Sequence, residues 1–421
     1  MEYKKYNLKK YNIHLIKTNK FKTITLTINF KRKVKKEDIT IRRLLADVLL
    51  ESSMKYPSVK LLEMETEELY GLSLKSDSFI SGNYDIMSFS QTFLSEKYTE
   101  LGMNKRSILF MLQLLLNPDI KNNEFSEYGF DLGYRIVKSN IKGFSDYPST
   151  YSSKRMLEVM DKNSSISYRN CGYLKDLNKI SRKDLYNYYK SVIEDDIIDI
   201  AIIGDIEDDI IDLFKNNFTR IKDNQKSESH YIKVDVKKLK EKQEKAKINQ
   251  SQLVIGCNVD YDDEKFLPYV LNIYSFILGG SGDSLLFKTV REENSLCYHI
   301  SSSYNIICSL ISIKAGIDGK NYSKTVELIK QCMNKLETGD FNDDEIEKAK
   351  IIYKNSCIEM MDAPGSIINN FLSHEYLKTD LIKDRVKKID MVTKEMVMDL
   401  AKKIKINTIY MLEGENNEKK V

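Results

Sequence analysis

The stretch Leu278-Gly-Gly-Ser-Gly-Asp-Ser-Leu-Leu-Phe287 decides how the second half of the chain is expected to fold. Three glycines within residues 279–282 let the backbone adopt conformations and make close approaches that a Cβ atom forbids. The pair Asp283-Ser284 then offers an N-cap for a helix. Arg291 lies on this helix-like segment, and Tyr298 begins the next β-like run. The stretch therefore predicts a glycine-rich turn, a short helix and a strand, with one arginine and one tyrosine along them.

This turn does not carry the signatures of a phosphate-binding loop. A P-loop needs a Lys-Ser or Lys-Thr pair after its last glycine, and none follows Gly282. A dinucleotide-binding fingerprint needs a further spaced glycine, which is missing. The role of the turn has to come from the rest of the chain.

Length and composition indicate a globular protein of two or more domains. The chain has 421 residues, of which 42% are hydrophobic and 30% charged, and this length exceeds one ordinary core. Lys+Arg (66) nearly balance Asp+Glu (62), which argues against a dedicated nucleic-acid binder. No run reaches the ~18 apolar residues of a membrane span, and the N-terminus has no apolar signal-peptide core. We expect a cytoplasmic protein that binds neither nucleic acid nor membrane.

The six cysteines show no CxxC or metal-binding spacing. Cys257, Cys297 and Cys308 lie in β-like apolar runs. Scattered cysteines of this kind behave as small hydrophobic residues. All six are predicted to be reduced thiols in the core.

Periodicity predicts an α+β fold that occurs twice in the chain. In the first half a capped helix starts at Ser181 and leads to an apolar strand that ends at Gly204. In the second half a capped helix starts at Thr393 and leads to a strand that ends at Gly414. These matching offsets predict two homologous domains, each a mixed or antiparallel β-sheet packed with helices. A chance match of two helix–strand units is the alternative.

A charged stretch separates the two halves. Residues 233–250 are dense in charge and poor in large apolar residues, which is typical of a linker. A solvated surface helix over 236–245 is an equal alternative. We predict an N-terminal domain at 1–230, a linker at 231–250 and a C-terminal domain at 251–421, together forming one half of a clamshell.

The second half resembles the pitrilysin/insulinase family of metalloproteases, the inverzincins. The resemblance rests on the glycine-rich turn with its Ser-x-Leu-Phe core, on Arg291-Glu-Glu and on Leu296-Cys-Tyr298. Residues 242–257 are also similar to the linker and first strand of the family's second domain. Ser295 departs from the pattern, because the family usually has glycine there. The resemblance spans both halves and implies two domains of one fold that act on peptides.

Active members of this family hold zinc with a His-x-x-Glu-His helix in the first half. Two imidazoles on one helix face bind Zn²⁺, and the glutamate is the general base. Counting back from Pro57 puts the equivalent positions at Arg43, Ala46 and Asp47, which are a permanent cation, a side chain without a proton acceptor and a lone carboxylate. A later helix, expected over 132–145, has no carboxylate for the family's further ligand. The resemblance therefore implies a pseudopeptidase without catalytic residues, metal or cofactor.

The histidines suggest no other metal site. All four lie far apart in the sequence. His374-Glu375 begins a His-Glu-x-x-His pattern, but Lys378 stands where the second histidine would be, so we interpret the match as chance. His299 is expected on a strand surface or in packing.

The second-domain half of the family's site is retained. In the family, the residues that correspond to Arg291 and Tyr298 reach toward the substrate peptide, and both are donors suited to a peptide carbonyl. The alternative is structural, with Arg291 paired to a carboxylate such as Glu292 and Tyr298 packed in the fold. Four turn residues complete the suspected peptide-binding set: Gly279, Gly280, Ser281 and Gly282.

This combination resembles an inactive subgroup of the family, associated with the 5-aminopentanol modification of elongation factor P and commonly encoded beside a zinc-bearing sister. Lys55-Tyr-Pro-Ser-Val-Lys-Leu-Leu62 and Glu68-Leu-Tyr-Gly-Leu-Ser-Leu74 carry this resemblance. It implies the regulatory or substrate-binding subunit of a heterodimer with a zinc-bearing insulinase-family sister, acting on a peptide or unfolded polypeptide. The alternative is a non-enzymatic peptide-binding or scaffold protein that acts as a homodimer or monomer.

Overall fold

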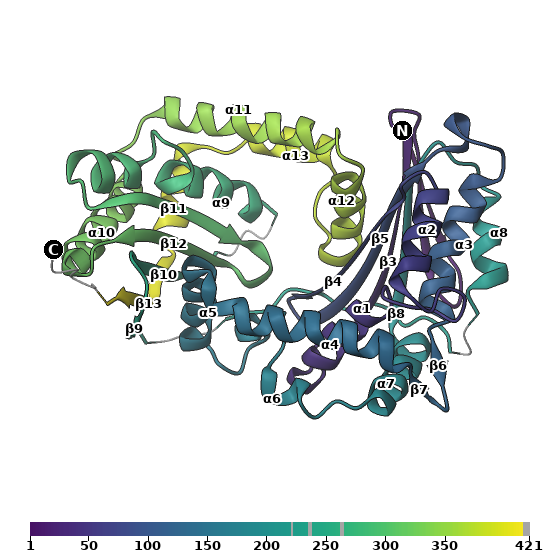
Figure 1. Cartoon of the computed structure of the whole chain (residues 1–421). Helices are drawn as coiled ribbons and strands as arrows, with labels where there is room; N and C mark the ends of the chain where they lie inside the picture. The colour runs from purple at the N-terminus through teal and green to yellow at the C-terminus, as the bar shows by residue number, and fades with distance from the viewer. Residues whose placement is uncertain (220–221, 235–237, 262–264, 416–421) are drawn as a thin grey trace. The chain divides into compact units, whose positions relative to one another are not determined.

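The computed structural model describes residues 1–219, 222–234, 238–261 and 265–415, which form two compact units (Figure 1). In each unit helices pack on a β-sheet, so the predicted α+β fold is confirmed. Unit 1 is built from three segments of the chain: Met1–Gly143, Arg169–His230 and Met361–Lys378. Unit 2 is built from the other three: Phe144–Tyr168, Tyr231–Met360 and Thr379–Val421.

Unit 1 contains a mixed sheet in the order β1-β2-β8-β3-β5-β4, in which only β2 and β8 run parallel. Its strands are β1 (Glu2–Asn7), β2 (Asn12–Lys17), β3 (Thr23–Lys33), β4 (Ser73–Ser81), β5 (Tyr84–Leu94) and β8 (Ile197–Gly204). Its helices are α1 (Ile39–Val48), α2 (Val59–Glu68), α3 (Met103–Leu116), α4 (Glu127–Lys142), α6 (Leu174–Leu177), α7 (Arg182–Asp195), α8 (Ile210–Asn217) and α12 (Pro364–Leu377). A small ribbon of β6 (Ile120–Lys121) and β7 (Glu124–Phe125) joins α3 to α4.

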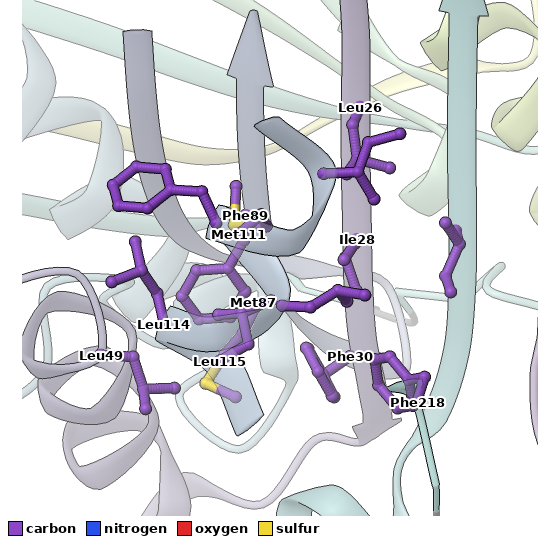
Figure 2. Packing of buried hydrophobic residues seen from close by; sticks show 14 of the residues in the cluster. Leu26, Ile28, Phe30, Leu49, Met87, Phe89, Met111, Leu114, Leu115 and Phe218 are labelled. Atoms are coloured by element: carbon purple, nitrogen blue, oxygen red, sulfur yellow. The ribbon is translucent and has the colours of Figure 1, made fainter. Parts of the chain in front are cut away.

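Alternation along β3 gives the sheet of unit 1 one apolar and one polar face. Its apolar residues point toward the helices, and Figure 2 shows Leu26, Ile28 and Phe30 packed with a second group that includes Leu49, Met111, Leu114 and Leu115. The residues between them point to the opposite face: Thr25, Thr27, Asn29 and Lys31. The main core of unit 1 therefore lies on one side of its sheet only.

Unit 2 contains a sheet in the order β11-β12-β10-β13-β9, in which only β13 and β9 run parallel. Its strands are β9 (Lys240–Ala246), β10 (Ser251–Val259), β11 (Cys297–Asn305), β12 (Leu310–Ile317) and β13 (Ile404–Gly414). Its helices are α5 (Pro148–Met160), α9 (Leu267–Ser275), α10 (Tyr322–Thr338), α11 (Asp343–Met360), α13 (Ile382–Asp390) and α14 (Lys394–Ala401), with π-helical turns η5 (Phe276–Gly280) and η6 (Phe287–Glu293).

The two sheets repeat the same topology. Strands β4, β5, β3, β8 and β2 of unit 1 follow the same order and directions as β11, β12, β10, β13 and β9 of unit 2. The matching ends also agree, because Ser181 caps α7 before β8 and Thr393 caps α14 before β13. The predicted duplication is confirmed, and β1 is the one strand of the first sheet without a counterpart in the described part of the second.

Each unit takes one helix from the other half of the sequence. Helix α5 packs on β10 and β13 in unit 2, and α12 packs on β8 and β3 in unit 1. Both helices occupy the sheet face opposite the main core. The chain therefore cannot be divided into the two units by a single cut. Each sheet is covered on its second face by a helix from the other repeat.

The stretch expected as a linker at 231–250 contains a strand instead. Residues Lys240–Ala246 form β9, which pairs in parallel with β13 at the edge of the sheet. Its side chains are mostly exposed, so its sequence shows charge rather than apolar alternation. Charged edge strands of this kind resist pairing with other chains. The alternative of a surface helix over 236–245 is wrong for the residues described there.

The cysteines are free thiols, as expected, and five of them are buried. Cys171 is half-buried, so the expectation of a core position is wrong for this residue. None of the helices in the described part of the chain is long and apolar enough to cross a membrane.

Candidate functional site

Helix α1 carries an ion pair at the positions where the family's zinc motif would lie. Arg43 donates from Nη2 and Nε to the Asp47 carboxylate at 2.8 and 3.2 Å, and Asp77 of β4 lies 3.1 Å from Arg43 Nη1. Burial raises the pKa of the Asp47 carboxyl, although the Arg43 charge opposes this shift. Ala46 is fully buried. A guanidinium therefore fills the space beside the carboxylate, and no side chain at position 46 can take a proton from water.

Helix α4 packs against α1 through glycines. A Cβ atom on Gly133 would lie 2.4 Å from Val48 Cγ2, and one on Gly129 would lie 2.2 Å from Ser52 Oγ. Periodicity favours a helix over 124–142, and α4 begins at Glu127, before the segment 132–145 in which a further ligand was sought. It does carry carboxylates, Glu127 and Asp131, but both are exposed. The face of α4 that meets α1 leaves no room for a further ligand side chain at its two glycines.

The described residues contain no group of three or more His, Cys, Asp or Glu side chains arranged to hold a metal ion. A pocket of about 510 Å³ does open in unit 1 beside α2 and α3, with Tyr56, Arg106 and Gln113 among its lining residues. The residues at positions 43, 46 and 47 do not line it. The pocket is therefore separate from the Arg43–Asp47 ion pair of α1.

The glycine-rich turn lies between η5 and η6 and packs against β11. A Cβ atom on Gly279 would lie 2.6 Å from the backbone nitrogen of Ser302, so this close approach requires glycine. None of the three turn glycines, all within the described chain, has a left-handed φ. Ser284 directly precedes the helix, as expected for a cap residue, and its carbonyl accepts from the Lys288 N–H at 3.0 Å. Before it, Ser281 Oγ accepts from the Asp283 backbone N–H at 3.3 Å. The glycine at position 279 lets the turn pack closely against β11, directly before the next helix begins.

Arg291 and Tyr298 flank the start of β11. The Arg291 guanidinium lies 4.5 Å from the Phe287 ring centroid and forms no ion pair with a described residue, Glu292 included. Tyr298 is 84% exposed. It lies in a β-bulge, because Cys297 pairs with Ile317 whereas His299 pairs with its neighbour Gly316. Arg291 therefore has a stacking contact but no ion pair with a described residue, and Tyr298 is not packed in the fold.

Ser295 takes the backbone conformation that favours glycine. Its φ is 52°, in the left-handed region. Its N–H donates to the Arg291 carbonyl at 3.1 Å, and the Leu296 N–H donates to the Val290 carbonyl at 3.0 Å. This is a helix C-cap of the Schellman type. Glycine suits this position because it adopts a left-handed φ without a steric penalty, whereas Ser295 is strained there.

Strands β4 and β11 occupy equivalent edges of the two sheets, and each leaves one hydrogen-bonding edge open. Among the described residues, β4 pairs only with β5, and β11 pairs only with β12. The β4 edge carries Asp77 and Ser76, which contact the Arg43–Asp47 pair. The β11 edge carries the exposed Tyr298. An extended peptide can add to such an edge through main-chain hydrogen bonds.

A buried polar cluster anchors α12 on the sheet of unit 1, and sequence reasoning missed it. Lys31 Nζ lies 3.0 Å from Asp199 Oδ2 and 3.4 Å from the centroid of the Tyr376 ring. The Tyr376 hydroxyl donates to Asp199 at 2.8 Å. Burial alone would raise the pKa of the Asp199 carboxyl, but Lys31 with hydrogen bonds from His14 and Asn12 holds it far below its usual range. A charged residue within the apolar run of β8 was the sequence signal for this cluster.

The remaining histidines are structural or exposed. His230 is fully buried and stacks between Tyr84 and Tyr376, with ring centroids 4.3 and 5.0 Å away. His374 lies in α12, and Lys378 ends that helix with a φ of 55°. His299 is exposed on β11. None of these positions reproduces a paired-histidine helix face.

Comparisons with known proteins agree with this geometry. The family profile described as "Peptidase M16 inactive domain" matches residues 179–353. The protein named "Probable inactive metalloprotease YmfF" from Bacillus subtilis (strain 168) is 26% identical over 407 residues, which cover 95% of each chain. The chain is therefore an inactive homologue of the M16 peptidases. The resemblance to the pitrilysin/insulinase family is confirmed.

Two further comparisons characterise this M16 pseudopeptidase. It is 23% identical over 348 residues to the "Uncharacterized zinc protease YmxG" of Bacillus subtilis (strain 168), covering 79% of this chain and 82% of that one. A crystal structure of a conserved protein from Enterococcus faecalis V583 superposes with a TM-score of 0.92 at 25% identity, covering 99% of both chains. The pseudopeptidase thus shares the fold of this neighbour over nearly its whole length, and its helix α1 carries the Arg43–Asp47 ion pair.

Proposed function

We propose that this M16 pseudopeptidase is the substrate-binding subunit of a heterodimer with a zinc-bearing sister chain. The observation that carries the proposal is the placement of Tyr298, which is 84% exposed at a bulge of an open-edged strand. The exposure of the Tyr298 phenol argues against a packing role, and Arg291, which stacks on Phe287, forms no ion pair with a described residue. Both groups are donors for a peptide carbonyl or a developing oxyanion.

The metal chemistry then has to come from another chain. In α1 the Arg43 cation would repel Zn²⁺, and Ala46 offers no general base. Similarity both to an inactive and to a zinc-type relative supports a pairing of unlike chains. The bound peptide would extend the sheet at β11 or β4, whose outer edges are open in the described chain.

The test is reconstitution with a sister chain that has an intact His-x-x-Glu-His helix. We expect the sister to cleave a fluorogenic peptide efficiently only when this chain is present. Arg291→Gln and Tyr298→Phe should each lower kcat/KM by about tenfold to a hundredfold, since a lost hydrogen bond to developing charge costs roughly 1.5–3 kcal/mol. Matched controls are Lys330→Gln and Tyr147→Phe, which alter an exposed cation and an exposed phenol elsewhere in unit 2.

Several outcomes contradict the proposal. The purified chain should contain no zinc by plasma mass spectrometry, and one zinc ion per chain would overturn it. Full activity of the sister alone would also overturn it. A stable homodimer that binds peptides without a sister would favour a non-enzymatic peptide-binding or scaffold protein instead.

A further inference from the structure

The sheet of unit 2 carries a half-buried cation without a counter-charge. Lys314 lies in β12, where Ile313 and Ala315 point into the main core. Lys314 therefore points to the opposite face. It forms no ion pair with any described residue. Burial lowers the pKa of its ammonium group, and no acidic side chain opposes that shift.

Donor groups surround Lys314 on the same face. Ser301 of β11 lies directly opposite Lys314, and Ser303 lies opposite Ser312. Directly paired residues bring their Cβ atoms to within about 5 Å. His299 precedes Ser301 by two residues and shares its face, with its Nε2 3.2 Å from Ser301 Oγ. The groups are hydroxyls, an imidazole and an ammonium, and none is an acid.

The strand on the other side of Lys314 supplies no carboxylate either. On β10 the residues of this face are Gln252, Val254 and Gly256, with Val254 directly opposite Lys314. Unit 1 shows the usual solution, since Lys31 on its sheet is neutralised by Asp199 at 3.0 Å. A cation withdrawn from water without a partner costs free energy. Groups of this kind often mark a place where a ligand brings the missing charge.

We propose that Lys314, Ser301 and His299 form a carboxylate subsite for a peptide bound along β11. The inference rests on the proposed function and specifies its substrate class: peptides with an acidic side chain, or a free C-terminal carboxylate, within reach of Lys314. The lysine supplies the charge, and the serine hydroxyl and imidazole supply hydrogen bonds to the carboxylate oxygens. The location agrees with the proposed peptide path, because Ser301 and His299 lie on the open-edged strand that also carries Tyr298.

The experiment measures binding of fluorescein-labelled peptides to the full chain, alone and with the sister, by fluorescence anisotropy. The probes are peptides of about ten alternating threonines and valines. One has a central glutamate and an amidated end, one has glutamine in its place, and one has glutamine and a free C-terminal carboxylate. Comparison of the three separates an acidic side chain from a chain terminus as the source of the carboxylate.

Lys314→Met removes the charge and keeps most of the stem. We expect it to weaken the carboxylate-bearing peptide by about tenfold and the amidated glutamine peptide by less than about twofold. Lys314→Arg should retain the preference, and Lys330→Met, on the exposed face of α10, should change nothing.

Equal affinity for the glutamate and both glutamine peptides would overturn the subsite and leave the proposed function standing. An equal loss for all peptides in Lys314→Met would also overturn it, because that result indicates a structural role. Failure of every peptide to bind, with or without the sister, would contradict the proposed function itself.

Discussion

The two sheets have the same strand order, yet their second faces are covered by opposite chemistry. In unit 1, α12 is held by a buried ion pair, since Lys31 and Asp199 meet the Tyr376 hydroxyl and ring. In unit 2, α5 is held by Met156 and Met160, since a Cβ on Gly256 would lie 2.6 Å from Met156 Sδ and 2.4 Å from Met160 Cε. Its ion pair, Arg155 with Glu244, is partly exposed and not buried like that of unit 1. One fold thus accepts a polar anchor and an apolar anchor at equivalent places.

Because the two anchors differ in chemistry, the two helices should respond to different changes. Methionine packing stabilises in proportion to buried area and depends little on pH. A buried ion pair depends on both partners, because the loss of one leaves the other desolvated and uncompensated. We therefore expect α12 to respond to charge and pH, and α5 to respond to volume.

The largest effect is expected from Asp199→Asn. The change leaves Lys31 buried without its counter-charge, so unit 1 should lose about 3–5 kcal/mol of stability. Urea unfolding followed by circular dichroism measures this loss. In unit 2, Met160→Ala should cost about 2–3 kcal/mol through the cavity it leaves.

The control for the polar anchor is the double variant Lys31→Met, Asp199→Asn. It removes both charges, so it should be more stable than Asp199→Asn alone. A double variant as unstable as the single one, or a single variant within about 1 kcal/mol of the wild type, would show that the ion pair does not anchor α12.

Acidification should loosen α12 and leave α5 in place. Burial, helped by the Lys31 charge, lowers the pKa of His230 from 6.5 to about 4. The folded protein therefore binds this proton more weakly than the unfolded chain. The resulting stability is complete above about pH 6.5 and is lost as the pH falls toward 4, by about 1–2 kcal/mol once solvent screening is allowed for.

The groups that face His230 are Tyr84, Tyr376, Ser81 and Ser227, with Lys31 and Asp199 close enough to act on its charge. In unit 2, Arg155 holds the pKa of Glu244 at about 2, so its contact with α5 keeps its charges at pH 4.5. Hydrogen exchange at pH 7 and pH 4.5, corrected for intrinsic rates, compares the two helices. His230→Gln should abolish the difference for α12, and an equal loss of protection in both helices would contradict this assignment.

The smallest effect concerns the residue that ends the helix before each edge hairpin. Unit 1 uses Gly71, with a φ of 71° and open space around it, and unit 2 uses Ser295 with a φ of 52°. Ser295→Gly should stabilise the protein by about 0.5–1 kcal/mol, and Gly71→Ala should destabilise it by about 1 kcal/mol. Thermal unfolding measures both. A destabilising Ser295→Gly would mean that the serine side chain matters more than its backbone.

Periodicity predicted the elements whose own residues carry the signal. The pair of α7 and β8 follows from the Ser181 cap and from the apolar run that ends at Gly204. Strands β1 and β9 were missed because their exposed, charged side chains show no apolar alternation and their pairing comes from neighbouring strands. The exchange of α5 and α12 left no local signal, because an apolar helix face does not specify which sheet covers it.

In the candidate site, residue identities could be predicted from the sequence, but contacts between distant residues could not. Counting from Pro57 predicted the positions 43, 46 and 47, and α1 has the Arg43–Asp47 ion pair and the buried Ala46 there. That these positions replace a zinc motif stays a prediction. The segment 132–145 in which a further ligand was sought leaves out the first turn of α4, where the Ser126 side chain accepts from the Gly129 N–H. The contacts of Asp199 with Lys31 and Tyr376 join residues 168 and 177 positions apart, which no local pattern encodes.

The exchange of helices also sets the order in which the protein can be completed during translation. Helix α5 is made before all of the described strands of unit 2, so it is available as each of these strands is synthesised. In unit 1 the order is reversed. Its strands are synthesised first, and α12, which begins at Pro364, is made long after β8, which ends at Gly204. Until then the face with Lys31 and Asp199 has water in place of Tyr376. In an N-terminal fragment that stops before α12, the sheet face of unit 1 that α12 covers is therefore exposed. A chaperone that binds such a fragment, or a nascent chain on a stalled ribosome, would encounter this polar face.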